Sequence, residues 1–148
     1  MKKPLLSWFL LLGLLHAQSA PSLSPIVAYW KTLDAQQKET FLFSYLTEVY
    51  ETFTDLKGEF GYNDLTNWYY DHKARVCFAI LNELDTTELS VFVQWVDEYY
   101  SHDENVGEPF EEALLFAYRF QQAPGDNLIE KYQNLQFEAL PDEKSDGQ

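Results

Sequence analysis

Residues 35–58 read AQQKETFLFSYLTEVYETFTDLKG, and their apolar side chains recur every three or four positions. This spacing places them along one side of an amphipathic α-helix, as expected for a helix that packs on a core. The apolar positions are Leu42, Tyr45, Leu46, Val49, Phe53 and Leu56. Asp34 with Gln37 forms a box-like start, and Gly58 is a natural stop. A long helix is therefore predicted between these signals.

Start and stop signals on both sides of this segment predict five more helices. Ser24 is expected to cap the first, with Pro25 at its first helical position. Asp85 with Glu88, and later Asp126, are the start signals of two others. The five segments cover 25–33, 65–84, 86–101, 109–122 and 127–140.

No segment has the features of a paired strand, and no Asn-Gly or Asp-Gly hairpin turn occurs between the predicted helices. In the segment 65–84, helical spacing is expected to turn Leu65 and Tyr69 toward the core together with Val76 and Ile80. The predicted fold is all-α: a compact irregular bundle of about five to six helices that follows a cleaved signal peptide.

The two ends of the chain differ from this helical part. The sequence begins MKKPLLSWFLLLGLLHAQSA, with two lysines, an apolar run of eleven residues and small residues after it. This order predicts a signal peptide over 1–19, and the run is too short to cross a bilayer. A single helical domain is expected over 20–140 and a disordered acidic tail over 141–148. The protein is therefore expected to be periplasmic or secreted, without a membrane anchor after cleavage.

The charge of the chain restricts its partners. The net charge is −14, and loss of Lys2 and Lys3 with the signal peptide leaves 8 basic residues against 24 acidic ones, or −16. Such a chain is repelled by nucleic acid phosphates and by anionic membranes. A protein with a basic surface, or cations, would suit it as partners, and the same charge also serves solubility.

Motifs of catalysis are missing from the sequence. It contains no Gly-rich phosphate loop, no G-x-S-x-G and no H-E-x-x-H. Cys77 is the single cysteine and stands among apolar residues, so it is predicted to be a small buried side chain without a disulfide. We therefore expect a non-enzymatic protein without a cofactor.

The stretch EYYSHDENVGEPF, residues 98–110, crowds titratable and turn residues between two predicted helices. It does not fit an EF-hand loop, because the sixth and twelfth positions from Asp103 are not glycine and glutamate. A helix–loop–helix corner accounts for every residue, with His102 at a helix C-terminus and Pro109 opening the next helix. Asn105 is expected to position the corner through side-chain bonds to its own backbone.

A metal site is the alternative interpretation. His72 and His102 are the two histidines outside the predicted signal peptide. Side chains from separate helices could meet in space, and nearby acids could complete a ligand set. A metal-dependent enzyme or metal-binding protein built on these two histidines therefore stays open as the second hypothesis.

A binding patch is predicted from aromatic and acidic residues. Two predicted helices each carry a pair of adjacent tyrosines, and the members of such a pair cannot both point inward. Tyr70 and Tyr99 are expected to be the outward members. Together with the corner they form the candidate binding patch, whose residues are Tyr70, Tyr99, His102, Asp103 and Glu104.

Two segments also resemble known proteins. The first is W-x-x-L-x-x-x-x-K, at Trp30, Leu33 and Lys38, and the second is VDEYYSHDENVGEPFEEAL. The matching positions of the second are Asp97, Tyr100, Asp103, Glu104, Asn105, Pro109 and Ala113. The pattern resembles small secreted bacterial helical proteins of uncharacterised function. More distantly, size, secretion and helical make-up are similar to the Rap1a/Tai immunity proteins of type VI secretion. That resemblance implies a small periplasmic helical protein that blocks a secreted toxin, and it transfers no catalytic residue.

Overall fold

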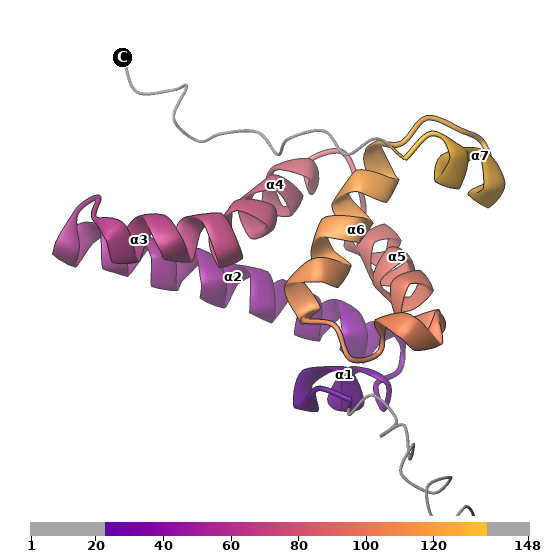
Figure 1. Ribbon diagram of the computed structural model, residues 1–148, viewed down its shortest axis with the longest axis horizontal. Helices are drawn as coiled ribbons and strands as arrows, with labels where there is room; N and C mark the ends of the chain where they lie inside the picture. Colours follow the sequence, from indigo (N-terminus) through magenta and orange to yellow (C-terminus); the bar gives the residue numbers. More distant parts are fainter. Residues whose placement is uncertain (1–22, 136–148) are drawn as a thin grey trace, which may run out of the picture.

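A computed structural model describes residues 23–135, in which helices follow one another through short turns (Figure 1). The elements are α1 (Pro25–Trp30), α2 (Ala35–Phe60), α3 (Asp64–Tyr69), the π-helical turn η1 (Tyr70–Ala74), α4 (Arg75–Glu83), α5 (Leu89–Ser101), the 3-10 turn η2 (Asp103–Asn105), α6 (Phe110–Gln122) and α7 (Leu128–Gln133). No strand occurs within this range, so the predicted all-α fold is confirmed. The predicted signal peptide (1–19) and acidic tail (141–148) lie outside the described residues.

Helix α2 is the longest element and organises the others. The segment α3–η1–α4 returns alongside it, and α5 and α6 lie side by side against α2 and α4 (Figure 1). Helix α1 lies at the N-terminal end of α2, and α7 lies beyond the C-terminal end of α6 (Figure 1). The arrangement is the irregular bundle expected from the helical spacing.

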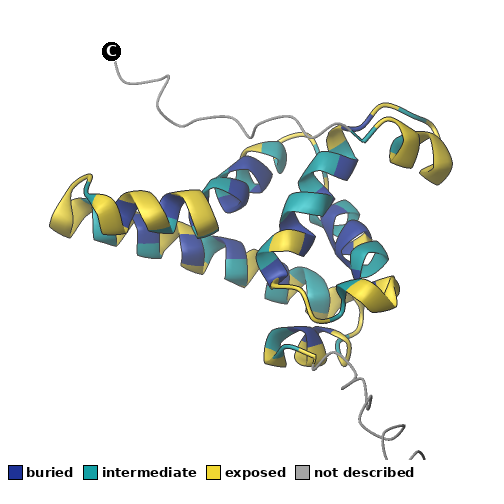
Figure 2. Ribbon diagram, viewed as in Figure 1, coloured by how far each residue is buried: buried dark blue, intermediate teal, exposed yellow. Residues whose placement is uncertain are grey.

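The core lies where these helices face one another (Figure 2). Leu42, Leu46, Val49 and Phe53 of α2 are all buried, which confirms the predicted apolar stripe. Phe110, at the start of α6, has ring contacts to Trp30, Phe41, Tyr45 and Tyr100. Full burial of a side chain such as Phe contributes about 1.5–3 kcal/mol to stability, so this aromatic cluster helps to hold the start of α6.

Two predicted helix starts are confirmed. The Ser24 hydroxyl accepts a hydrogen bond from the Val27 amide at 3.3 Å, and Pro25 begins α1. Asp34 and Gln37 form the complete capping box, with the Gln37 amide donating to Asp34 Oδ1 at 2.9 Å. Each cap satisfies amides that have no partner inside the helix.

Three other predicted boundaries are wrong. Helix α2 continues through Gly58 and ends before Gly61, whose φ of 64° suits glycine and reverses the chain. Helix α5 begins after Glu88 rather than after Asp85, because the residues that follow α4 form turns, and the Glu88 side chain makes no cap bond. The cap of α7 is Asn127 rather than Asp126, since the Asn127 side chain accepts the Glu130 amide at 3.0 Å.

The predicted helix 65–84 is interrupted, and this changes which residues are buried. The π-helical turn η1 adds a residue to one turn, so positions before it are rotated relative to a regular 3.6-residue helix. As a result Leu65 is 55% exposed, and Tyr70, which was expected near the surface, is buried. The predicted outward position of Tyr70 is therefore wrong, and its ring packs on Phe53.

Candidate functional site

The corner between α5 and α6 is held by two side chains. The Asn105 amide donates to the Tyr99 carbonyl at 3.0 Å, where α5 ends and carbonyls lack helical partners. This bond reaches six residues back, so the expectation that Asn105 bonds its own backbone is wrong. The Tyr100 hydroxyl bonds the carbonyls of Glu108 and Pro109 at 3.3 and 3.2 Å. These bonds fix the turn that carries His102.

Helix α7 brings a further aromatic residue to this corner. Lys131 donates to the carbonyls of Phe120 and Ala123 at 3.1 and 2.7 Å, which satisfies the C-terminal end of α6 with a positive charge. The neighbouring Tyr132 packs its ring on Phe120, with centroids 4.8 Å apart. The docking of α7 therefore places Tyr132 next to α5.

His102 and Tyr132 share one carboxylate. The Tyr132 hydroxyl donates to Glu98 Oε1 at 3.1 Å and lies 3.2 Å from His102 Nε2. His102 Nε2 is 3.6 Å from the same Glu98 oxygen, and its Nδ1 is 4.0 Å from Glu104 Oε1. The imidazole thus has a carboxylate on each side.

A small hollow of about 170 Å³ opens between these groups. Its lining residues are Tyr99, His102, Glu104, Asn105, Phe116 and Tyr132. Phe116 lies between the two tyrosines, with ring centroids 5.4 Å from Tyr99 and 6.1 Å from Tyr132. Three residues of the predicted patch therefore meet here, while Asp103 is exposed on η2 outside the lining and Tyr70 belongs to the core.

The phenols of this hollow remain protonated at neutral pH. Burial, followed by the charges of Glu108 and Glu112, raises the pKa of Tyr99 to about 12. Burial and the hydrogen bond to Glu98 raise the pKa of Tyr132 to about 12. Both hydroxyls can therefore donate hydrogen bonds, and the surrounding carboxylates give the hollow a negative potential.

His72 lies in a different environment. Its Nδ1 is 2.8 Å from the Trp68 carbonyl, and its ring stacks on Trp68 at 4.9 Å between centroids. It lines a separate hollow of about 190 Å³ between η1, α4 and α6. Within residues 23–135 no group of three or more His, Cys, Asp and Glu is arranged to hold a metal ion. The structure therefore does not bring His72 and His102 into one ligand set.

A cluster of polar side chains lies in the interior near Cys77. Glu111 accepts hydrogen bonds from Tyr45, at 2.7 Å, and from Lys73. Burial raises the pKa of Glu111, but these bonds outweigh it and hold the pKa below its usual value. Cys77 is fully buried, as predicted, and burial raises its pKa to about 12. The thiol therefore stays protonated, unlike a nucleophilic cysteine.

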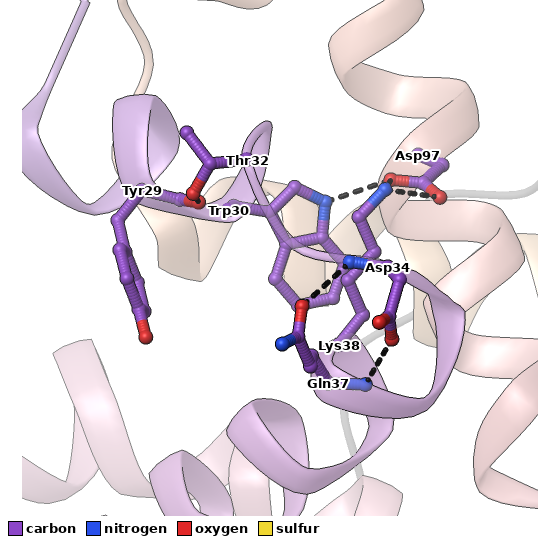
Figure 3. A network of polar contacts seen from close by, with 7 residues as sticks. All are labelled: Tyr29, Trp30, Thr32, Asp34, Gln37, Lys38 and Asp97. Atoms are coloured by element: carbon purple, nitrogen blue, oxygen red, sulfur yellow. Dashed lines mark hydrogen bonds and ion pairs between the residues drawn. The ribbon is translucent and has the colours of Figure 1, made fainter.

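A second polar site was missed by the sequence analysis. The Trp30 indole donates to Asp97 Oδ1 at 2.7 Å, and Lys38 Nζ lies 2.8 and 2.9 Å from the two Asp97 oxygens (Figure 3). We call Trp30, Lys38 and Asp97 the Asp97 clamp, because it ties α1 and α2 to α5. All three residues lie in the two sequence segments that were singled out above, but nothing in the sequence says that they meet.

Comparisons of the chain with family models, curated proteins and solved structures find no match. Within the described residues, none of the helices combines the length and the apolar character needed to cross a bilayer. The functional argument therefore rests on the geometry and chemistry of the chain itself.

Proposed function

We propose that the chain is an exported, non-enzymatic binding protein that engages a basic region of another protein. The binding region is its acidic–aromatic surface, defined as Glu98, Tyr99, His102, Asp103, Glu104 and Tyr132. One observation carries the proposal: side chains from α5, η2 and α7 meet around a hollow with aromatic walls and carboxylates at its edge.

The size and charge of the hollow favour an inserted Arg or Lys side chain. Its volume of about 170 Å³ is below the ~300–1,000 Å³ of pockets for drug-sized ligands. A cationic side chain over the ring of Tyr99 or Tyr132 would gain a cation–π contact of about 0.5–2 kcal/mol. Glu98 and Glu104 would add charge-assisted hydrogen bonds. The net charge of −14 would speed the encounter with a basic partner.

The distant resemblance to immunity proteins extends this proposal to the nature of the partner. A secreted toxin with an exposed basic residue would fit an exported acidic protein of this size. The chemistry that recognises it is the same: a cationic side chain in the hollow, surrounded by weaker contacts at the edge of the surface.

The test is a titration of isotope-labelled protein with hexa-arginine peptide, followed by NMR. Amide shifts should concentrate at Tyr99, His102 and Tyr132, and they should weaken as salt is added. The double variant E98Q/E104Q should lose most of the binding. A matched control, E51Q/E59Q, removes two exposed charges of α2 and should bind like the wild type. Equal losses in both variants, or shifts spread over all acidic positions, would reject the proposal.

A further inference from the structure

The angle between α1 and α2 forms a second large hollow, separate from the acidic–aromatic surface. Its volume is about 570 Å³, within the ~300–1,000 Å³ that small-molecule sites occupy. Tyr29 of α1 forms one wall, and Gln36, Gln37, Thr40 and other residues of the first turns of α2 form another. We propose that this hollow binds an uncharged sugar, as one or more pyranose units of a glycan.

The lining of this hollow carries little charge, in contrast to the strongly acidic chain as a whole. Among its lining residues, Asp34 is the one acidic residue, and none is Lys, Arg or His. The others carry amides, hydroxyls, aromatic rings or an aliphatic chain, although the whole protein has 24 acidic residues. An anionic ligand would find no cationic side chain here, and the Asp34 carboxylate already accepts the Gln37 amide in the capping box. An uncharged ligand rich in hydroxyl groups is the class that suits this lining.

Tyr29 supplies the stacking surface that such a ligand requires. The residue is 55% exposed, so its ring is available to solvent. Phe41 supports it in an edge-to-face contact, with centroids 5.7 Å apart and planes at 61°. Phe41 is in turn packed against Trp30 at 5.9 Å. The C–H groups on one face of a pyranose carry partial positive charge, which the negative face of an aromatic ring attracts.

The polar groups of the hollow offer both donors and acceptors. The Gln36 side chain makes no hydrogen bond to another described residue, and Gln37 uses only its oxygen, on the Asp34 amide at 3.0 Å. The hydroxyls of Thr40 and Ser44 donate to backbone carbonyls at 3.1 and 2.8 Å, so their lone pairs remain as acceptors. Sugar hydroxyls both donate and accept, and planar amides can bond two of them at once.

The Asp97 clamp fixes the shape of the hollow before a ligand arrives. Trp30 follows Tyr29 in α1 and is bonded to the carboxylate that also holds Lys38 of α2 (Figure 3). Tyr29 points away from that contact (Figure 3). The angle between the two helices is thus set by buried and bonded side chains. A site that is already ordered loses less conformational entropy on binding.

The experiment is an NMR titration of the labelled protein with tri-N-acetylchitotriose. Saturable shifts are expected at Tyr29, Gln36, Gln37 and Thr40 by about 10 mM sugar, ten times a dissociation constant of about 1 mM. The variants Y29A and Q36A should each weaken binding at least about tenfold, the effect of ~1.4 kcal/mol. Both residues are exposed, so both variants should fold, which circular dichroism would verify.

The matched control is Y62A, which removes another exposed tyrosine at the far end of α2. It should bind the sugar like the wild type, and so should E98Q/E104Q, because the acidic–aromatic surface is a separate site. Absence of saturable shifts at the hollow would overturn the inference. So would an equal loss of binding in Y62A and Y29A. Neither result would affect the proposal of a basic partner.

Discussion

Asp97 and Glu98 are neighbours in α5, yet they hold different parts of the molecule. Asp97 binds the indole of Trp30 and the ammonium of Lys38, and so fastens α1 and α2. Glu98 binds the phenol of Tyr132, near His102, and so contacts α7. Trp30 is 1% exposed, whereas Tyr132 is 39% exposed. The same carboxylate chemistry therefore joins helices where its partner is buried, and it forms only an exposed contact where its partner faces water.

The largest expected effect is that of W30A, on the Asp97 side of this comparison. Replacing a buried Trp by Ala costs about 3–5 kcal/mol, because apolar contacts are lost and a cavity remains. Chemical denaturation should show this loss in the free energy of unfolding. The matched variant W30F keeps a ring and loses the indole donor, so it should lose less. A W30A protein as stable as the wild type would contradict a structural role of the clamp.

The charge of Asp97 should matter less than the ring of Trp30. The variant D97N keeps a side chain of similar size but weakens the bonds to Lys38 and to the indole. We expect a loss of about 1–2 kcal/mol, since hydrogen bonds to charged groups contribute more than neutral ones and Asp97 is partly exposed. A double-mutant cycle with K38M should give a coupling energy above zero. A coupling of zero would show that the pair does not stabilise the fold.

The loss of stability expected for a substitution of Glu111 is small, and its dependence on pH can be measured. Its pKa is lowered in the folded protein, so its contribution to stability is present above the usual value of 4.5 and is lost as pH falls through the lower folded value. The variant E111Q should be about 1 kcal/mol less stable at neutral pH, because charge-assisted bonds from Lys73 and Tyr45 weaken. The difference should shrink as the pH falls through the lowered pKa of Glu111 in the folded protein. Unfolding curves at several pH values would measure it, and a constant difference would contradict the assignment.

Much of the fold could be predicted because it depends on local signals. The capping pair Asp34–Gln37 spans three residues, and the buried face of α2 follows from its helical period. The π-helical turn could not be foreseen in the same way, since it changes the phase of a helix without a glycine or proline to mark it. The exposed Leu65 and the buried Tyr70 both follow from that one inserted residue.

The sites depended on contacts that are distant in sequence. Trp30 and Asp97 are 67 positions apart, and Tyr132 is 34 positions from Glu98. Spacing within one helix says nothing about such pairs. The predicted patch nevertheless contained Tyr99, His102 and Glu104, because these residues are close in sequence and the corner keeps them together. The missing member, Tyr132, comes from a helix whose position is set by Lys131 at the end of α6.

The smallest expected effect is that of E98Q, which removes the charge from the exposed contact between Glu98 and Tyr132. The pair with Tyr132 is exposed, so the loss of stability should stay within about 1 kcal/mol. The pKa of Tyr132 should nevertheless fall from about 12 toward 10.0, since the negative partner that helps to raise it is gone. Carbon NMR of labelled tyrosine rings across alkaline pH would follow this shift.

Stability and peptide binding of E98Q, compared at neutral pH, separate a binding role of Glu98 from a structural one. A raised pKa means that the contribution of the Tyr132–Glu98 bond is present below pH 10 and is lost as pH rises through about 12. At neutral pH the bond is therefore intact in the wild type. If E98Q destabilised the fold as much as D97N, the distinction between the two neighbours would fail. If E98Q left stability unchanged and abolished peptide binding, Glu98 would serve the partner rather than the fold.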